Sequence, residues 1–299
     1  MTQVAGKTAF ITGGGSGVGF GQAKVFAAAG CRIAIADIRQ DHLDEAKAHF
    51  DAIGVDAMTV RLDITDREAY ARAADAVEAK LGPVQLLFNT AGVSIFGPLQ
   101  NATYDDWDWQ LEVNVKGVIN GIQTFLPRML KRGDDCHIIN TASMSAFVAL
   151  PGTGIYCTSK MAIRGLSECL SMDLKDTSVR VSMLCPGAVN TNIHEAVLTR
   201  PAHLQSTGYY GASPEVFAHL KRVIEVGMEP ETLARYVLKG VEKDQLYILP
   251  YPEFRERLEA IHADVMAALA RPEDDPEYEK RVKRGVPGGE QRKEESAAG

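Results

Sequence analysis

A tyrosine and a lysine stand four residues apart in the stretch YCTSK, Tyr156 to Lys160, which has the pattern of the start of a helix. Residues at positions i and i+4 share one helix face, so the ammonium group of Lys160 can lie close to the phenol of Tyr156. Free tyrosine has a pKa of about 10, and a nearby positive charge lowers it. The spacing therefore predicts a phenol adapted to proton transfer. The alternative is a chance pairing, because Y-x-x-x-K alone is a common pattern.

Two more polar residues stand where a substrate oxygen could be held. Ser143 follows the apolar run CHIIN, 13 residues before Tyr156. If that run is a strand, the serine hydroxyl lies at its carboxyl end, where open parallel sheets bind ligands. Asn114 lies among apolar neighbours in LEVNVKGVINGI, and a hydrogen-bonded interior amide is the alternative for it. The candidate catalytic residues are Asn114, Ser143, Tyr156 and Lys160.

A glycine-rich loop follows the first apolar run. Gly13, Gly15, Gly17 and Gly19 stand between KTAFIT and a segment of helical pattern. Glycine lets the backbone approach a pyrophosphate closely, and the amides at the start of the next helix favour its negative charge. The spacing is T-G-x-x-x-G-x-G and differs from G-x-G-x-x-G. Its position between a strand and a helix nevertheless predicts a dinucleotide site.

Asp37 ends the second apolar run, 24 residues after Gly13. A carboxylate about 20 residues beyond such a loop hydrogen-bonds the adenosine ribose and repels the 2′-phosphate of NADP. The sequence therefore favours NAD over NADP as the cofactor. Two alternatives stay open at this point: Asp37 as a helix cap, and Arg39 as a partner for the phosphate of NADP.

The first 190 residues have the pattern of a sheet that would bring these groups together. Short runs rich in β-branched residues alternate with segments of helical period such as 40–53 and 66–80. Near-continuous apolar runs are typical of strands buried on both faces. We predict an α/β fold with a Rossmann-type doubly wound parallel β-sheet, helices on both faces and a single domain. The predicted strands are 7–12, 31–37, 57–63, 84–89, 136–140, 179–186 and 246–250.

The predicted dinucleotide-binding and catalytic domain spans residues 1–271. Within it, a segment of about 190–225, rich in Gly, Pro, His and Tyr, is expected to form a substrate lid, and a helix is expected at 252–270. Residues 272–299 carry charges of both signs and few apolar residues, so we predict a mobile tail. Removal of 285–299 is expected to leave folding and activity unchanged.

Composition and charge narrow the class of partner. A net charge of -7 argues against nucleic acid and against an anionic membrane surface. No apolar run approaches the roughly 20 residues that would span a bilayer. The five cysteines are scattered without metal-ligand spacing, which fits reduced thiols in a cytosol. We expect a cytoplasmic protein with no metal site, no nucleic-acid partner and no membrane partner.

Over roughly residues 5–250 the chain resembles the short-chain dehydrogenase/reductase family. The resemblance rests on an ordered series: TGGGSGVG (12–19), Asp37, LDI (62–64), NTAG (89–92), Asn114, Ser143, YCTSK and PGAVNT (186–191). It implies an enzyme that interconverts a small-molecule alcohol and its ketone by hydride transfer, as a homodimer or homotetramer. The helices carrying Asn114 and Tyr156 form the usual subunit contact of this family.

The resemblance also implies roles for the site residues. Tyr156 would be the general acid/base, Lys160 would hold the nicotinamide ribose and lower the pKa of the phenol, Ser143 would orient the reacting oxygen, and Asn114 would support a proton relay. Thr90 departs from the family pattern, which usually has a second asparagine there. Backbone contacts dominate at that position, so little effect is expected.

The resemblance implies a set of cofactor-binding residues as well. Within it, Asp63 and Ile64 would flank the adenine, and Thr191 would contact the carboxamide. The full set is Gly13, Ser16, Gly17, Val18, Gly19, Asp37, Asp63, Ile64, Asn89, Ala91, Gly92, Tyr156, Lys160, Pro186, Gly187, Val189 and Thr191.

The predicted substrate pocket is apolar and aromatic, which indicates a bulky, uncharged or aromatic secondary alcohol. The alternative is that these aromatic residues only pack the lid. The pocket residues are Phe96, Met144, Phe147, Val148, His194, Tyr209 and Tyr210.

A narrower resemblance concerns the substrate. The phrases ADIRQDHLDEA (36–46), ATYDDWDW (102–109), TNIHEA (191–196), MEPETLARYV (228–237) and LYILPYPEF (246–254) are similar to bacterial Cα-dehydrogenases of lignin-derived aryl ethers. Those enzymes are NAD-dependent and oxidise a benzylic alcohol. Steroid or terpenoid alcohols stay open as alternative substrates. A non-catalytic NAD(H)-binding sensor is a further alternative, although such proteins typically lack the tyrosine and lysine that this chain has.

Overall fold

Seven parallel strands form one sheet in the part of the chain that the structure, a computed structural model, describes. That part comprises residues 2–209, 222 and 224–283, so Tyr210 and the end of the predicted tail lie outside it. Hydrogen-bonded neighbours follow the order β3-β2-β1-β4-β5-β6-β7. The strands are β1 Thr8–Thr12, β2 Arg32–Asp37, β3 Met58–Arg61, β4 Val84–Asn89, β5 Cys136–Thr141, β6 Val179–Leu184 and β7 Tyr247–Ile248.

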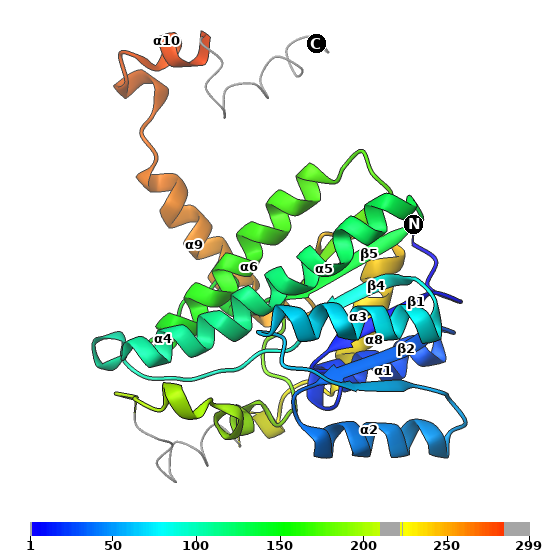
Figure 1. Cartoon of the computed structure of the whole chain (residues 1–299). Helices are drawn as coiled ribbons and strands as arrows, with labels where there is room; N and C mark the ends of the chain where they lie inside the picture. Colours follow the sequence, from blue (N-terminus) through cyan, green and yellow to red (C-terminus); the bar gives the residue numbers. More distant parts are fainter. Residues whose placement is uncertain (1, 210–221, 223, 284–299) are drawn as a thin grey trace. The chain divides into compact units, whose positions relative to one another are not determined.

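Helices cover both faces of this sheet (Figure 1). Their bounds are α1 Gly17–Ala28, α2 Gln40–Ala52, α3 Arg67–Leu81, α4 Tyr104–Leu111, α5 Gly117–Arg132, α6 Gly154–Asp173 and α8 Pro230–Glu242. One apolar core joins α1, α2 and α8 to the sheet, while α3, α5 and α6 pack on its other face. The predicted doubly wound parallel sheet of Rossmann type is therefore confirmed.

The strands form because their apolar side chains are buried on both faces. All five residues of β1 and all six of β5 are buried, without the alternation of a half-exposed strand. On one face, the ring centroid of Phe10 lies 5.9 Å from that of Tyr70 and 4.9 Å from that of Phe125. The next residue, Ile11, packs in the core on the opposite face. Each such side chain contributes roughly 1.5–3 kcal/mol to folding, so both layers hold the strand ends in place.

A π-helical turn, η2 (Glu112–Lys116), joins α4 to α5. The helix α4 begins at a capping box, in which the side chains of Thr103 and Asp106 accept hydrogen bonds from each other's backbone amides. Single π turns inside helices occur frequently at functional sites. Asn114 lies in the middle of this turn and is fully buried, so the turn determines where its amide points.

The described chain separates into two compact units, Met1–Phe254 and a second unit that begins at Arg255. The second unit contains α9 (Arg255–Ala268), the short turn η7 (Pro272–Asp274) and α10 (Tyr278–Lys283). The helix expected at 252–270 therefore exists with slightly narrower bounds, whereas the extent of the catalytic domain stays a prediction. Among the described helices, none combines the length and the apolar character needed to cross a membrane.

Candidate active site

A cavity of about 1140 Å³ lies where the strands end, at the edge formed by their carboxyl termini. The strand order reverses between β1 and β4, and a parallel sheet of this type binds ligands outside such a reversal. Most of the predicted cofactor residues line this cavity. They are Gly13, Ser16, Gly17, Val18, Gly19, Asp37, Asp63, Ile64, Ala91, Gly92, Tyr156, Lys160, Pro186, Gly187, Val189 and Thr191.

Asn89 is the predicted cofactor residue that does not line the cavity. Its side chain is buried within the sheet and donates from Nδ2 to Oδ1 of Asn140 at 2.9 Å. Asn140 in turn donates to the hydroxyl of Ser167 on α6 at 3.0 Å. The side chain of Asn89 therefore cross-links β4 and β5 beneath the site.

The glycine loop forms a cradle of bare backbone at the start of α1. A Cβ atom on Gly19 would lie 2.2 Å from the carbonyl oxygen of Gly13, and one on Gly13 would lie 2.8 Å from Cα of Ala91. Gly13 and Gly17 also have positive φ values of 63° and 49°, which favour glycine. Side chains are therefore excluded where the helix amides face the cavity. This geometry fits the pyrophosphate of a dinucleotide.

Asp37 lies at the end of β2 and lines the same cavity. Its Oδ2 accepts a hydrogen bond from the amide of Gly15, and its Oδ1 accepts one from the amide of Arg39, each at 3.1 Å. These bonds hold the carboxylate against the glycine loop. Asp63 also lines the cavity, and it accepts from the amide and the hydroxyl of Thr65 at 2.9 and 2.7 Å.

Tyr156 and Ser143 meet at the inner end of the cavity. The hydroxyl of Ser143 lies close enough to the phenol of Tyr156 to stabilise its ionised form. The Ser143 hydroxyl also accepts from the amide of Ser145 at 3.1 Å and donates to the carbonyl of Pro186 at 3.4 Å. Burial raises the pKa of Tyr156 above its ordinary value, while the neighbouring hydroxyl of Ser143 opposes that rise. The sequence had predicted that Lys160 would lower this pKa, but in the protein alone burial outweighs any such effect.

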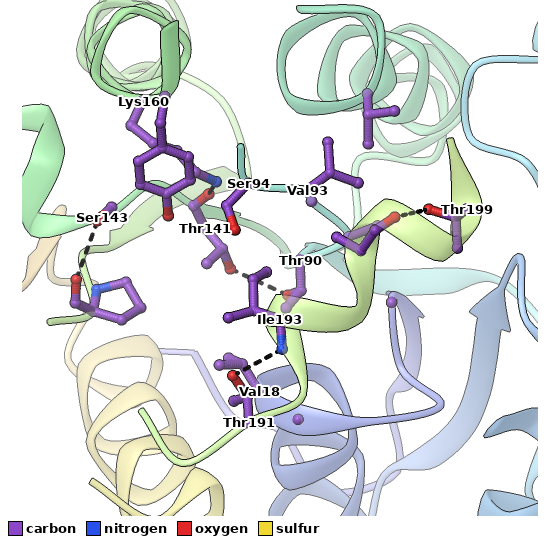
Figure 2. A pocket seen from close by; sticks show the side chains of 18 of the residues that line it. Val18, Thr90, Val93, Ser94, Thr141, Ser143, Lys160, Thr191, Ile193 and Thr199 are labelled. Carbon is purple, nitrogen blue, oxygen red and sulfur yellow. Dashed lines mark hydrogen bonds between the residues drawn. The ribbon is translucent and has the colours of Figure 1, made fainter. Parts of the chain in front are cut away.

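Lys160 is 5% exposed and donates from Nζ to the carbonyl oxygen of Thr141 at 3.1 Å. Its Nζ lies 5.6 Å from the ring centroid of Tyr156, so the two groups share one side of the cavity as the spacing predicted. Burial lowers the pKa of Lys160 to about 8. Figure 2 shows Ser143, Ser94 and Lys160 around one end of the cavity, with Thr191 and Ile193 farther along its wall.

Asn114 does not line the cavity but supports its wall. Its Oδ1 accepts from the amide of Val93 at 2.8 Å, and its Nδ2 donates to the carbonyl of Val93 at 2.9 Å. The same Nδ2 lies 3.1 Å from the hydroxyl of Ser159, the residue before Lys160. The π turn thus links the segment after β4 to the helix that carries Tyr156.

Thr90, the departure from the family pattern, has a side chain that faces the cavity wall. Its hydroxyl donates to Oε1 of Gln22 at 2.7 Å and lies 3.2 Å from the hydroxyl of Thr141. Its backbone amide donates to the hydroxyl of Thr12 at 3.0 Å. The hydroxyl of Thr90, just after β4, therefore links this segment by hydrogen bonds to α1 and β5.

The predicted substrate pocket is reproduced in part. Phe96, Met144 and Val148 line the cavity, whereas Phe147, His194 and Tyr209 do not. Phe147 lies under the guanidinium group of Arg164, which is 4.1 Å from its ring centroid. Tyr209 packs in an apolar cluster behind the cavity wall, with Trp109, which does line the cavity. Tyr210 lies outside the described residues.

Several residues that the sequence analysis did not select also line the cavity. They include Ser94, Trp109, Glu112, Val113, Leu150, Ile193, Glu195, Ala196, Leu204 and Phe254. Ser94 could have been found because it lies five residues after the end of β4, and Ser143 similarly lies two residues after the end of β5. The positions of Glu195 and Phe254 depend on contacts between distant parts of the chain, which no local pattern signals.

A buried ion pair attaches the segment after β6 to the helix α4. Nη1 of Arg200 lies 2.8 Å from Oδ1 of Asp106, and the two side chains are 9% and 0% exposed. The guanidinium carbon of Arg200 also lies 5.1 Å from the ring centroid of Trp109. Two short turns flank Arg200 in the sequence, η4 (Ile193–Thr199) before it and η5 (Ala202–Leu204) after it. Both turns contribute residues to the cavity wall.

The sheet, the glycine cradle and the pairing of Tyr156 with Ser143 beside Lys160 define a dinucleotide-dependent oxidoreductase. The chain belongs to the short chain dehydrogenase family, whose model matches residues 7–201. Members of this family use NAD or NADP, and the cavity described above fits either dinucleotide at its pyrophosphate end.

Three proteins of this family are similar to the chain over most of its length. The protein named C alpha-dehydrogenase of Sphingobium sp. strain NBRC 103272 / SYK-6 is 45% identical over 278 residues, 93% of this chain and 91% of that protein. The apo structure of LigO from Sphingobium sp. strain SYK-6 has a TM-score of 0.79 and 50% identity, covering 96% of this chain and 100% of that one. A short chain dehydrogenase/reductase from Burkholderia phymatum in complex with NAD has a TM-score of 0.85 and 33% identity, covering 90% and 98%. The predicted family and the narrower resemblance are both confirmed.

Proposed function

We propose that this protein is an NAD-dependent dehydrogenase that oxidises a bulky benzylic secondary alcohol to its ketone, with Tyr156 as the general base. The observation that carries the proposal is the meeting of Tyr156, Ser143 and Lys160 at the inner end of the cavity. These three groups lie beside the glycine cradle, so an alcohol held by Ser143 would be within reach of both the phenol and a dinucleotide.

Each polar residue of the site has a separate role in the proposed oxidation. NAD, when bound, supplies the acceptor for the hydride that leaves the alcohol carbon. Tyr156 takes the hydroxyl proton of the alcohol as the C=O bond forms, and Ser143 holds the reacting oxygen in place. Lys160, when protonated, favours the phenolate by its charge. Asn114 holds the backbone of Val93, which lines the cavity, and bonds to Ser159, the residue before Lys160.

NAD is proposed over NADP because of the charges at the adenosine end. Asp37 lines the cavity at the end of β2, where a carboxylate accepts bonds from the ribose hydroxyls. Arg39, the cation that could hold a 2′-phosphate, pairs with Asp41 and Glu195. A relative with a similar fold was solved in complex with NAD.

The proposed substrate class follows from the other end of the cavity. Phe96, Trp109, Met144, Val148 and Leu204 provide an apolar wall there. The ring centroid of Phe96 lies 5.8 Å from that of Tyr156, so an aryl group next to the reacting carbon would pack on Phe96. The 45% identity to a protein named C alpha-dehydrogenase supports the same class.

A panel of alcohols with NAD tests the proposal. Purified protein is assayed with an aryl glycerol ether, a 3-hydroxysteroid, a monoterpene alcohol and 2-butanol, and kcat/KM is compared. The aryl ether is expected to be best and 2-butanol poorest, because each buried methylene that a small substrate lacks forgoes roughly 0.8 kcal/mol of transfer free energy. A tenfold preference for the steroid or terpenoid would contradict the benzylic assignment. Binding of NADH, seen by protein fluorescence, without turnover of any alcohol would instead favour the sensor.

We also propose a homodimer or homotetramer that uses α5 and α6. Apolar side chains are exposed on both helices, with Ile119 and Leu130 on α5 and Met161 and Met172 on α6. Exposed apolar residues that gather on neighbouring elements indicate an interaction surface.

A further inference from the structure

Two segments that are far apart in the sequence are joined beside the adenosine end of the cavity. Nη1 of Arg39 donates to Oε2 of Glu195 at 2.7 Å, across a separation of 156 residues. Nδ2 of Asn192 lies 3.2 Å from Nε2 of His42 and 3.3 Å from Oε2 of Glu195. Arg39, His42, Asn192 and Glu195 all line the cavity, as does Asp37. The turn η4 is therefore attached directly to the loop after β2.

The guanidinium group of Arg39 is shared between two carboxylates. Its Nε donates to Oδ1 of Asp41 at 3.1 Å and its Nη2 pairs with the other oxygen of Asp41, while Nη1 is taken by Glu195. An arginine binds a phosphate best when it offers two N–H groups side by side. In this protein the edge of Arg39 formed by Nε and Nη2 binds Asp41, and the remaining nitrogen, Nη1, binds Glu195.

The charges around this arginine also oppose a phosphate. Asp41 and Glu195 place two carboxylates on one guanidinium group, and the carboxylate of Asp37 accepts from the backbone amide of the same arginine. The side chain of Arg39 is 24% exposed and that of Glu195 is 37% exposed, so both still face partly toward solvent and the cavity. A 2′-phosphate entering here would have to displace Glu195 and would meet an excess of negative charge.

We propose that Glu195 determines the choice of cofactor by occupying Arg39, which would otherwise bind the 2′-phosphate of NADP. Glu195 is then a specificity residue that lies on the turn η4, far in the sequence from the loop after β2 that local sequence patterns identify. The inference rests on the proposed use of NAD and deepens it. It also makes Asp37 only one of the carboxylates that exclude NADP.

Fluorescence titrations of NADH and NADPH test this proposal without any alcohol. They are made with the wild type, with Glu195→Gln, and with Glu195→Gln combined with Arg39→Gln. Glutamine keeps the size of the side chain and removes its charge. In Glu195→Gln the ratio of the NADPH to the NADH dissociation constant should fall roughly tenfold, as expected for one charge removed close to a phosphate. The second substitution should restore the wild-type ratio, because the gain requires Arg39.

Glu231→Gln is the matched control. Glu231 pairs with Lys24 in a similar, partly exposed ion pair but does not line the cavity, so its ratio should stay at the wild-type value. The proposal is overturned if Glu195→Gln leaves the ratio unchanged, or if the gain persists without Arg39. A wild-type protein that binds NADPH as tightly as NADH, or neither, would instead contradict the proposed use of NAD.

Discussion

The phenol of Tyr156 is the residue on which the proposed chemistry depends, and the protein alone does not lower its pKa. Burial raises the pKa of Tyr156, and the neighbouring hydroxyl of Ser143 offsets this rise in part. Lys160 lies close by, but burial reduces its own pKa to about 8, so part of its charge is lost at mildly alkaline pH. The phenolate that the proposed oxidation requires therefore depends on positive charge near the ring, which protonated Lys160 supplies and a bound oxidised nicotinamide would increase.

Tyr156→Phe should abolish turnover with the best alcohol of the panel. Removal of a positioned acid/base typically costs about 10²- to 10⁴-fold in rate. The ring itself is kept, together with its contact to Phe96, so NADH binding should remain close to that of the wild type. Steady-state kinetics and NADH fluorescence titration measure the two quantities. Retention of more than a few per cent of the wild-type kcat would exclude Tyr156 as the base.

At the scale of elements, the cavity wall after β6 depends on the contact between η5 and α4. Asp106 on α4 accepts from Nη1 of Arg200 at 2.8 Å and from the amide of Thr103 at 2.9 Å. Burial raises the pKa of Asp106, but these hydrogen bonds outweigh burial and the pKa lies below its ordinary value. Arg200 also donates to the carbonyl of Ser206 at 2.8 Å. One ion pair thus anchors a segment that lines the cavity.

Asp106→Asn should loosen this segment and raise KM for the alcohol, because it leaves the buried Arg200 without a full counter-charge. Breaking a buried pair in this way costs roughly 3 kcal/mol. Limited proteolysis should cut within 199–209 faster than in the wild type, while NADH binding changes little. Asp108→Asn is the control, since Asp108 lies on the same helix and is exposed. Equal proteolysis rates for the two variants would rule out the anchoring role.

The elements that could be predicted from the sequence are the strands and helices whose apolar residues follow a regular local spacing. The run 84–89 became β4 with identical bounds, and the helices at 40–53 and 66–80 were displaced by only a residue or so. The π turn at Asn114 was not predicted, because its widening leaves no signature in the spacing of apolar residues. Phe147 and Tyr209 were assigned to the pocket because an aromatic residue suits a pocket wall and a packed core equally well. The pair Arg39 and Glu195 requires the tertiary fold, so the sequence could not indicate it.

Considered as a whole molecule, the fold is also tied together at the edge of the sheet opposite the cavity. His137, near the start of β5, is fully buried. Its Nε2 lies 2.8 Å from the hydroxyl of Ser182 on β6, and its Nδ1 lies 3.2 Å from the hydroxyl of Thr2. Ser182 donates onward to the carbonyl of Gln245 at 2.6 Å, just before β7. The imidazole therefore connects the start of the chain to three strands.

This network predicts that acid weakens the fold through His137. Burial lowers the pKa of His137 to about 4, below its ordinary value of about 6.5. Between these two pKa values the unfolded chain binds a proton that the folded chain does not, so stability falls as the pH falls through that window. From pH 7 to pH 5, this residue should cost on the order of 2 kcal/mol in the free energy of unfolding.

Urea unfolding of the wild type and of His137→Gln at both pH values measures this cost. Glutamine does not titrate, and it can still hydrogen-bond toward Ser182. The variant is expected to be less stable than the wild type at pH 7, because its side chain cannot reproduce both bonds of the imidazole, but it should lose less stability on acidification. An equal loss in both proteins would show that His137 is not the group responsible. The effect should be separate from catalysis, because His137 does not line the cavity and Tyr156, Ser143 and Lys160 do.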